Sequence, residues 1–172
     1  MYPDLKELLS IFNDNKVKYL VVGGYAVSFH AQPRATKDLD ILIKPDAGNA
    51  AAVYAALKKF GAPLGGLGPD DLIERGKFFR MGTPPVMVDI LPEISGVDFD
   101  DAWPRRVEVT LDAATGLKAQ FISETDLIVA KLAAGRPQDL ADVDAINKAK
   151  GRNTGGSKPK RKRTPKKNPP KP

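Results

Sequence analysis

Two aspartates separated by one residue are the strongest chemical signal in this chain. Asp38 and Asp40 open an apolar stretch that continues to Ile43 and is typical of a buried β-strand. Alternate side chains of a strand share one face, so both carboxylates would point the same way. Like charges held so close repel and are costly to remove from water, and a cation would relieve both penalties. Ligands that are all oxygen favour a hard divalent cation such as Mg²⁺ or Mn²⁺.

A third acid, Asp89, lies inside the apolar run Val86–Leu91, which prolines bound on both sides. This composition predicts a second buried strand. A carboxylate among such residues needs a partner, because an isolated buried charge would otherwise neutralise. If the two strands are neighbours, three carboxylates meet at one place. Such a cluster can hold two divalent ions for in-line attack on a phosphorus centre.

Each feature also has a purely structural explanation when it is taken alone. Asp38 and Asp40 suit the polar start of a strand, with one of them capping a turn. Asp89 alone suits a strand-end acid that faces solvent, and the glycine pair Gly23-Gly24 suits a tight turn as well as a phosphate cradle. The glycine pair, the spacer, the Asp-x-Asp motif and the later acid together are more specific than any one of them.

This combination resembles the nucleotidyltransferase superfamily that includes DNA polymerase beta. The matching residues are Val22-Gly23-Gly24, Asp38-Leu39-Asp40 and Val88-Asp89-Ile90. The stretch from residue 34 to residue 40 is most similar to small stand-alone bacterial transferases related to the AbiEii-type toxins. The resemblance implies an enzyme that transfers a nucleoside monophosphate from an NTP to an acceptor hydroxyl and releases pyrophosphate.

The resemblance also implies a role for each residue of the motif. Asp38 and Asp40 would bind the catalytic metals, Mg²⁺ or Mn²⁺, and the triphosphate through them. Asp89 would complete the second metal site and help to activate the attacking hydroxyl. Gly23 and Gly24 would let the backbone approach the triphosphate more closely than a side chain allows.

Three further residues are candidates for nucleotide binding. Arg34 has the fork geometry that suits phosphate oxygens, and Thr36 would fix the loop before Asp38 by a hydrogen bond; both also suit an ordinary loop. Lys131 is an isolated cation in an otherwise apolar helix. By resemblance Lys131 would contact the phosphates with support from Asp142, whereas the structural alternative is a lysine that extends along its helix to solvent.

The elements that must position these residues alternate along the chain. Strands are expected at Val17–Val22, Leu39–Ile43, Lys77–Met81, Val86–Leu91, Arg106–Leu111 and Leu117–Ile122, and helices at Leu5–Phe12, Tyr25–Ala31, Ala47–Phe60 and as a C-terminal pair that starts after Ser123 and turns at Gly135. This order predicts an α/β (α+β) fold, with a small mixed sheet flanked by helices, as in a polymerase-beta-like core.

Charge divides the chain in two near residue 150. Nine of the 27 basic residues and none of the 21 acidic ones lie in 151–172, which leaves 18 basic against 21 acidic residues, a net charge of −3, in 1–150. The Pro- and Lys-rich tail is expected to be disordered, and residues 1–150 to form one nucleotidyltransferase domain. The tail favours nonspecific attraction to RNA phosphates, with a solubilising role or contact with anionic lipids as alternatives.

Composition also excludes several classes of function. The absence of cysteine and the single histidine, His30, argue against a zinc site or a cysteine nucleophile, and no apolar run predicts a membrane span or a secretion leader, so we expect a cytoplasmic protein. The leading hypothesis is a metal-dependent transferase that uses an NTP and modifies a hydroxyl of RNA, a protein or a small molecule. The basic tail favours RNA, tRNA included, and a toxin role with a cognate antitoxin or other partner protein stays open. The alternatives are a transferase for aminoglycosides or other small molecules and a non-catalytic nucleic-acid-binding protein with this fold and a basic tail.

Overall fold

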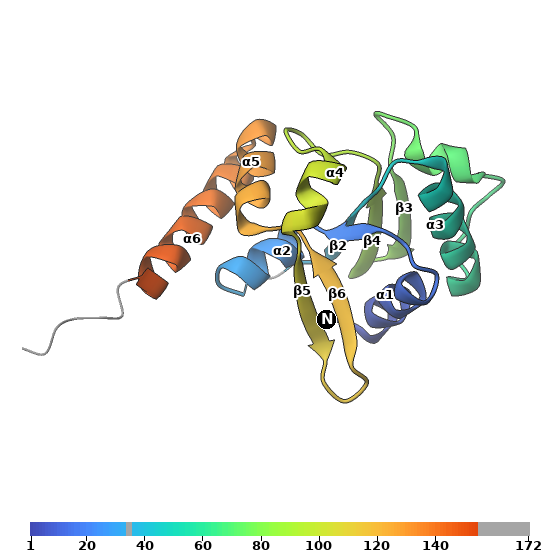
Figure 1. Cartoon of the computed structure of the whole chain (residues 1–172), viewed down its shortest axis with the longest axis horizontal. Helices are drawn as coiled ribbons and strands as arrows, with labels where there is room; N and C mark the ends of the chain where they lie inside the picture. Colours follow the sequence, from blue (N-terminus) through green and yellow to red (C-terminus); the bar gives the residue numbers. More distant parts are fainter. Residues whose placement is uncertain (34–35, 155–172) are drawn as a thin grey trace, which may run out of the picture.

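The computed structural model describes residues 1–33 and 36–154, which form a six-stranded mixed sheet with helices around it (Figure 1). The strands are β1 (Tyr19–Val21), β2 (Asp38–Ile43), β3 (Phe79–Thr83), β4 (Val86–Leu91), β5 (Val107–Asp112) and β6 (Leu117–Phe121). The α-helices are α1 (Pro3–Asp14), α2 (Gly23–His30), α3 (Ala47–Phe60), α4 (Phe99–Ala102), α5 (Glu124–Ala134) and α6 (Pro137–Thr154), and two 3₁₀ turns are η1 (Pro69–Ile73) and η2 (Trp103–Arg105). The fold class expected from the sequence is confirmed.

The strand order in the sheet is β3-β4-β2-β1-β6-β5. Strand β2 is antiparallel to β1 and parallel to β4, and β3 closes that side as the antiparallel partner of β4. The two strands that carry the three acids are therefore neighbours. Asp40 of β2 and Asp89 of β4 are direct register partners.

Local capping explains why several elements end where the sequence predicts. Helix α3 starts where the Asp46 side chain accepts a 2.8 Å hydrogen bond from Asn49 N–H, and it ends at Gly61 with φ +85°. Helix α5 starts with the Ser123 side chain accepting from Asp126 N–H and ends at Gly135 with φ +66°. A left-handed cap of this kind favours glycine, since other residues pay a steric penalty there.

The hydrophobic core joins the sheet to the amphipathic first helix. Leu8, Leu9 and Phe12 of α1 belong to the same buried cluster as Leu39 and Ile41 of β2. In Figure 1, α1 and α3 lie together at one end of the molecule, while α2, α5 and α6 gather at the other. The helical spacing of the apolar residues in α1 thus buries one stripe of that helix against the sheet.

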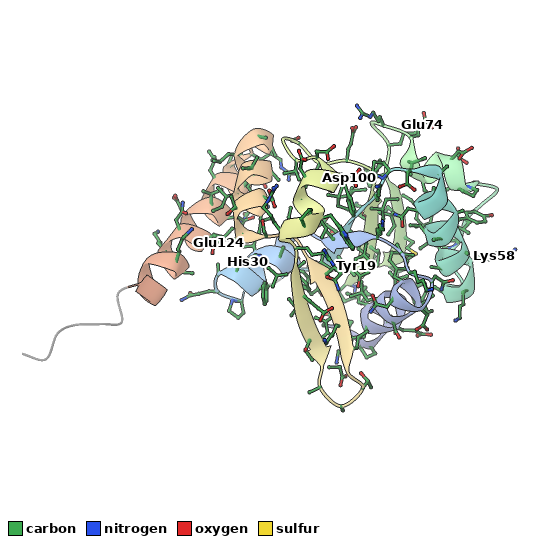
Figure 2. All side chains as sticks on the ribbon, in the orientation of Figure 1. Tyr19, His30, Lys58, Glu74, Asp100 and Glu124 are labelled. Carbon is green, nitrogen blue, oxygen red and sulfur yellow. The ribbon has the colours of Figure 1, made fainter. Side chains whose placement is uncertain are left out.

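Tyr19 shows how the core accommodates a polar group. Its side chain is fully buried on β1 and its ring packs edge-on against Phe12, with 5.7 Å between centroids. Its hydroxyl donates a 3.1 Å hydrogen bond to Asn13 Oδ1, and burial raises the pKa of Tyr19. Figure 2 labels Tyr19 in the interior, in contrast to Lys58, which points away from the outer face of α3.

Some boundaries differ from the sequence-based expectation. Helix α2 begins at Gly23 rather than Tyr25, because the extended Val22 is its N-cap and the glycine pair forms its first turn. Strand β3 starts two residues late, at Phe79, and extends to Thr83. The short helix α4 and the turn η2 were not expected; Asp98 caps α4 by accepting from the amides of Asp100 and Asp101.

The C-terminal boundary also moves. Helix α6 ends at Thr154, a few residues inside the stretch that composition assigned to the tail. The remainder of the basic tail lies outside the described residues, as does the candidate phosphate ligand Arg34. None of the helices in 1–33 and 36–154 has the length and apolar character that a membrane crossing needs.

Candidate active site

Three charged residues form one row across three adjacent strands. Asp40 of β2 pairs in register with Asp89 of β4, and Asp89 pairs in register with Arg80 of β3. Register partners point to the same face of a sheet, and Asp38 shares that face because it lies two residues from Asp40. The sheet therefore presents three carboxylates and one guanidinium side by side. The carboxylates of Asp38, Asp40 and Asp89 are called the acid row.

Arg80 holds the third acid with both arms of its guanidinium. Nε donates to Asp89 Oδ1 and Nη2 donates to Asp89 Oδ2, each at 2.6 Å. The Asp89 side chain is 7% exposed, whereas that of Arg80 is 49% exposed. This bidentate pair gives both oxygens of a buried carboxylate a charged partner, and the same hydrogen bond raises the pKa of Arg80.

The glycine pair lies directly against Asp40. Gly23 has φ +58°, and a Cβ added there would lie 2.6 Å from Cγ of Asp40. The backbone N–H of Gly24, in the first turn of α2, hydrogen-bonds to the Asp40 carboxylate. The first amides of a helix have no partner within the helix and favour negative charge, so this end of α2 suits an anion. The pair is thus a close approach of helix and acid rather than a plain tight turn.

The surroundings of Asp40 raise its pKa to about 6. Burial is the largest cause, followed by the negative charges of Asp89 and Asp38. The Gly24 amide and the positive charge of Lys131 act in the opposite direction and lower it. A carboxyl in this setting is strained when it is ionised, which is the condition that a bound cation would relieve.

Lys131 is buried between α5 and α6. Its Nζ donates to Oδ1 of Asp139 and Oδ2 of Asp142, both at 2.8 Å, and all three side chains are less than 10% exposed. The alternative of a lysine extending to solvent is therefore wrong. Asp142 contacts Lys131 as the resemblance implies, and Asp139 is a second partner.

Arg136 adds a second cation to this cluster from its exposed side, since its side chain is 74% exposed. Its Nε donates to Asp139 Oδ2 at 2.6 Å, so Asp139 receives two cations. Burial raises the pKa of Asp139, but the hydrogen bonds from Arg136 and Lys131 outweigh it and bring the pKa to about 2. The cluster joins the last turn of α5 to the first turn of α6 and places two cations beside the acid row.

These groups, Asp142 excepted, line one cavity of about 850 Å³. Its lining also includes the apolar side chains of Phe78, Leu91, Ile94 and Leu127, together with Glu93 and Ser95. A cavity of this volume, with both charged and apolar side chains in its lining, has room for a triphosphate and a second molecule.

The carboxylate oxygens of the acid row are ligands that suit a divalent cation, although the side chains do not converge on a single point. In residues 1–33 and 36–154 no group of three His, Asp or Glu side chains is arranged to hold a metal ion. Asp38 and Asp40 offer carboxylate oxygens on one strand face. Asp89 gives one lone pair of each oxygen to Arg80 and retains others. Mg²⁺ or Mn²⁺ would suit this oxygen-only set.

The remaining predicted residues take the following places. Thr36 lines the cavity, and its hydroxyl donates a long, 3.5 Å hydrogen bond to the Asp38 carbonyl, which agrees with a role in fixing that loop. Asp38, Asp40, Asp89, Gly23, Gly24 and Lys131 all line the same cavity.

Arg80 is a site residue that the sequence analysis missed, as is Arg136. A signal was present: with Pro84 and Pro85 as a two-residue loop, the β3–β4 hairpin pairs Thr83 with Val86 and, by simple counting, Arg80 with Asp89. The expectation of a four-residue connection from Gly82 to Pro85 hid this register. Hairpin register follows loop length, so the loop assignment decided whether Arg80 was noticed.

Comparison with known proteins places this geometry in context. Residues 3–149 match the family described as "Nucleotidyltransferase of unknown function (DUF6036)". A solved structure, the lincomycin-bound lincosamide antibiotic adenylyltransferase LnuA, is similar with a TM-score of 0.55 and 19% sequence identity over 86% of this chain and 96% of that one. No curated protein sequence is similar enough to this chain to count as a match. At this identity the structural likeness concerns the fold alone.

Proposed function

This chain belongs to the nucleotidyltransferase family that its residues 3–149 match, and on that basis we propose that it moves a nucleoside monophosphate from an NTP to an acceptor hydroxyl. The observation that carries the proposal is the register of Asp40 with Asp89 on parallel strands, with Asp38 on the same face and the Gly23-Gly24 end of α2 against them. Nucleotidyl transfer depends on positioning the two substrates and on neutralising the charge of the phosphates, and the acids, helix amides and cations of this site suit both tasks.

The residues divide the work as follows. Asp38, Asp40 and Asp89 would hold Mg²⁺ or Mn²⁺, which when bound would neutralise and polarise the triphosphate. The amides at the start of α2 would approach the phosphates, because Gly23 and Gly24 carry no side chain to block them. Asp89 would also accept the proton of the attacking hydroxyl.

Two cations beside the acids complete the proposed phosphate site. Lys131 and Arg136 line the same cavity as Asp38, Asp40 and Asp89, where their charge would attract the triphosphate. Thr36 would hold the loop before Asp38, and Arg34 would bind phosphate oxygens from that loop. The roles of these four residues are proposals that a substitution series can separate.

For the acceptor we retain RNA, tRNA included, as the first candidate. Its support is the basic stretch at 151–172, which suits nonspecific contact with phosphates. The likeness to AbiEii-type transferases, and with it a toxin role with a cognate antitoxin, stays a prediction from the motif. A small molecule is the second candidate, because the cavity, whose lining includes Phe78, Ile94 and Glu93, has the size and mixed polarity of a ligand site.

A labelling experiment tests the proposal. The full chain is incubated with Mg²⁺ and each of the four α-³²P-labelled NTPs, in the presence of total RNA or of a panel of small hydroxylated amines. We expect label on one acceptor class with wild type and none with Asp38→Ala or Asp40→Ala. Label on RNA would select the first candidate, and label on a small molecule the second.

The opposite results have a defined meaning. Wild-type labelling that survives Asp38→Ala would exclude that residue as a metal ligand. No NTP binding at all, together with salt-dependent RNA binding that Asp38→Ala leaves unchanged, would replace the enzyme with the non-catalytic nucleic-acid-binding protein considered from the sequence. Circular dichroism of each variant checks that the fold is intact.

A further inference from the structure

The guanidinium of Arg80 and a divalent cation compete for the same carboxylate. Both oxygens of Asp89 accept from Arg80 at 2.6 Å, and Asp89 is otherwise buried. The proposed second metal position requires Asp89 oxygens as well. A guanidinium and a divalent cation on one carboxylate would repel each other at close range in a partly dry site. Arg80 is therefore best placed to hold Asp89 only while the metal is absent.

Arg80 could also contact a ligand in the cavity. It lines the cavity together with the acid row, and about half of its side chain is exposed there. Its guanidinium carbon lies 5.4 Å from the ring centroid of Phe78, which itself is 55% exposed. A planar fork of donors on a cavity wall matches phosphate oxygens as well as it matches a carboxylate.

We propose that Arg80 is a positioning residue that exchanges partners: it holds Asp89 in the free protein and passes to the phosphates of the nucleotide when metal and triphosphate bind. The inference rests on the proposed function, which assigns the metal position at Asp89; the geometry supplies the Arg80–Asp89 pair. It makes Asp89 available only when the substrate is present. It also supplies a cation to the pyrophosphate end of the nucleotide, where negative charge accumulates as the leaving group departs.

The exchange predicts that removing Arg80 improves metal binding. Mn²⁺ binding to the nucleotide-free full chain is measured by electron paramagnetic resonance and by calorimetry for wild type and Arg80→Gln. We expect Arg80→Gln to bind Mn²⁺ about tenfold more tightly, because a charge-assisted competitor for Asp89 is gone. Equal or weaker Mn²⁺ binding would overturn the exchange and leave Arg80 as a residue that merely preorganises a metal ligand.

Two further variants guard this test. Arg80→Lys keeps a positive charge without the bidentate fork, so its Mn²⁺ affinity should lie between wild type and Arg80→Gln, and it remains informative if Arg80→Gln does not fold. Arg75→Gln removes an exposed arginine just before the same strand, and its Mn²⁺ affinity should equal that of wild type. If Arg75→Gln and Arg80→Gln change Mn²⁺ binding equally, the effect is general electrostatics and the exchange is refuted.

A nucleotide arm tests the second half. Binding of α,β-methylene NTP analogues with Mn²⁺ is measured for wild type and Arg80→Gln. We expect Arg80→Gln to bind the analogue at least fivefold more weakly even though it binds Mn²⁺ more tightly. Equal analogue affinity would exclude transfer of Arg80 to the phosphates. Failure of wild type to bind any analogue would instead contradict the proposed function, while the metal arm would still decide the competition for Asp89.

Discussion

The pairing of β2 with β4 places Asp40 where its ionised form is unfavourable. Its carboxylate lies beside Asp89 and Asp38 in a partly dry site, and its pKa rises from 3.8 to about 6. Because the folded pKa is higher than the unfolded one, the stability linked to this group is present below about pH 4 and lost as pH rises through 6. At neutral pH and without a bound metal, ionised Asp40 therefore lowers the free energy of unfolding relative to its protonated form.

Asp40→Asn should stabilise the fold and abolish nucleotidyl transfer. In EDTA at pH 7.5 we expect the free energy of unfolding to increase by about 2 kcal/mol, because Asn keeps the contact with Gly24 and removes the strained charge. At pH 4 the gain should vanish, and at either pH nucleotidyl transfer should be lost. Urea unfolding followed by fluorescence measures the stability. Asp144→Asn, an exposed acid on α6, is the control and should change stability by less than about 0.5 kcal/mol.

Gly23 is a second residue whose type the site dictates. Gly23→Ala must adopt φ near +58° and place a Cβ inside the Asp40 side chain, so we expect a loss of stability of about 1–3 kcal/mol. Activity should fall about 100-fold, since the Asp40 side chain must be displaced from its position in the site. Gly48→Ala in α3, where the added Cβ meets only an ordinary 3.5 Å contact, should be neutral or slightly stabilising. Equal effects of the two substitutions in thermal melts and turnover assays would contradict this account.

At the scale of elements, what could be predicted from the sequence is what local chemistry decides. The bounds of α3 and β4 agree with the prediction because a capping side chain, a terminal glycine or flanking prolines lie next to them in the chain. The acids of β2 and β4 were likewise predictable as strand residues. Their neighbourhood in the sheet was available only through the family resemblance, because strand order depends on contacts between distant segments.

Contacts across elements could not be predicted in this way. Arg105 forms a bidentate pair with Asp126, 21 residues away, with a shortest distance of 2.7 Å, and ties η2 to the start of α5. Nothing in the sequence around either residue indicates that pairing. The same holds for Asp139, whose burial depends on how α6 turns back on α5. Side-chain networks of this kind appear only once the helices are packed.

The Lys131 cluster is the element-scale feature most open to test. Lys131→Met leaves the buried carboxylates of Asp139 and Asp142 without their shared cation, so we expect a loss of about 3 kcal/mol in the free energy of unfolding at pH 7. Lys58→Met, on the exposed face of α3, should cost less than about 0.5 kcal/mol. Urea titrations measure both.

The same pair of variants separates a structural from a functional Lys131. If the phosphate contact proposed for Lys131 is made, Lys131→Met should also raise KM for the NTP under conditions where the variant remains folded. A large stability loss with an unchanged KM would assign Lys131 to the α5–α6 junction alone. Lys58→Met should leave KM unchanged in either case.

At the scale of the whole molecule, charge is divided between two regions of the chain. Residues 1–150 carry a net charge of −3, and the basic excess lies beyond them. Four cations line the cavity among the described residues, and three of them are paired with acids: Arg80 with Asp89, and Lys131 and Arg136 with Asp139; the fourth is Lys37. Attraction of a long polyanion such as RNA would therefore depend on the C-terminal segment rather than on the cavity wall.

Truncation after Thr154 tests this division. It removes eight basic residues and no acid, which changes the formal net charge from +6 to −2. If the segment supplies the RNA affinity, truncation should weaken RNA binding and abolish most of its salt dependence, whose slope in log K against log salt can reach about −6 for eight contacts with a single strand. Turnover with a small acceptor should stay within about twofold of wild type, since every described cavity residue is retained. A tail of equal length with glutamine at the eight positions should behave like the truncation; RNA binding that survives both changes would place the RNA contact on the folded domain and make the cavity rim the surface to mutate next.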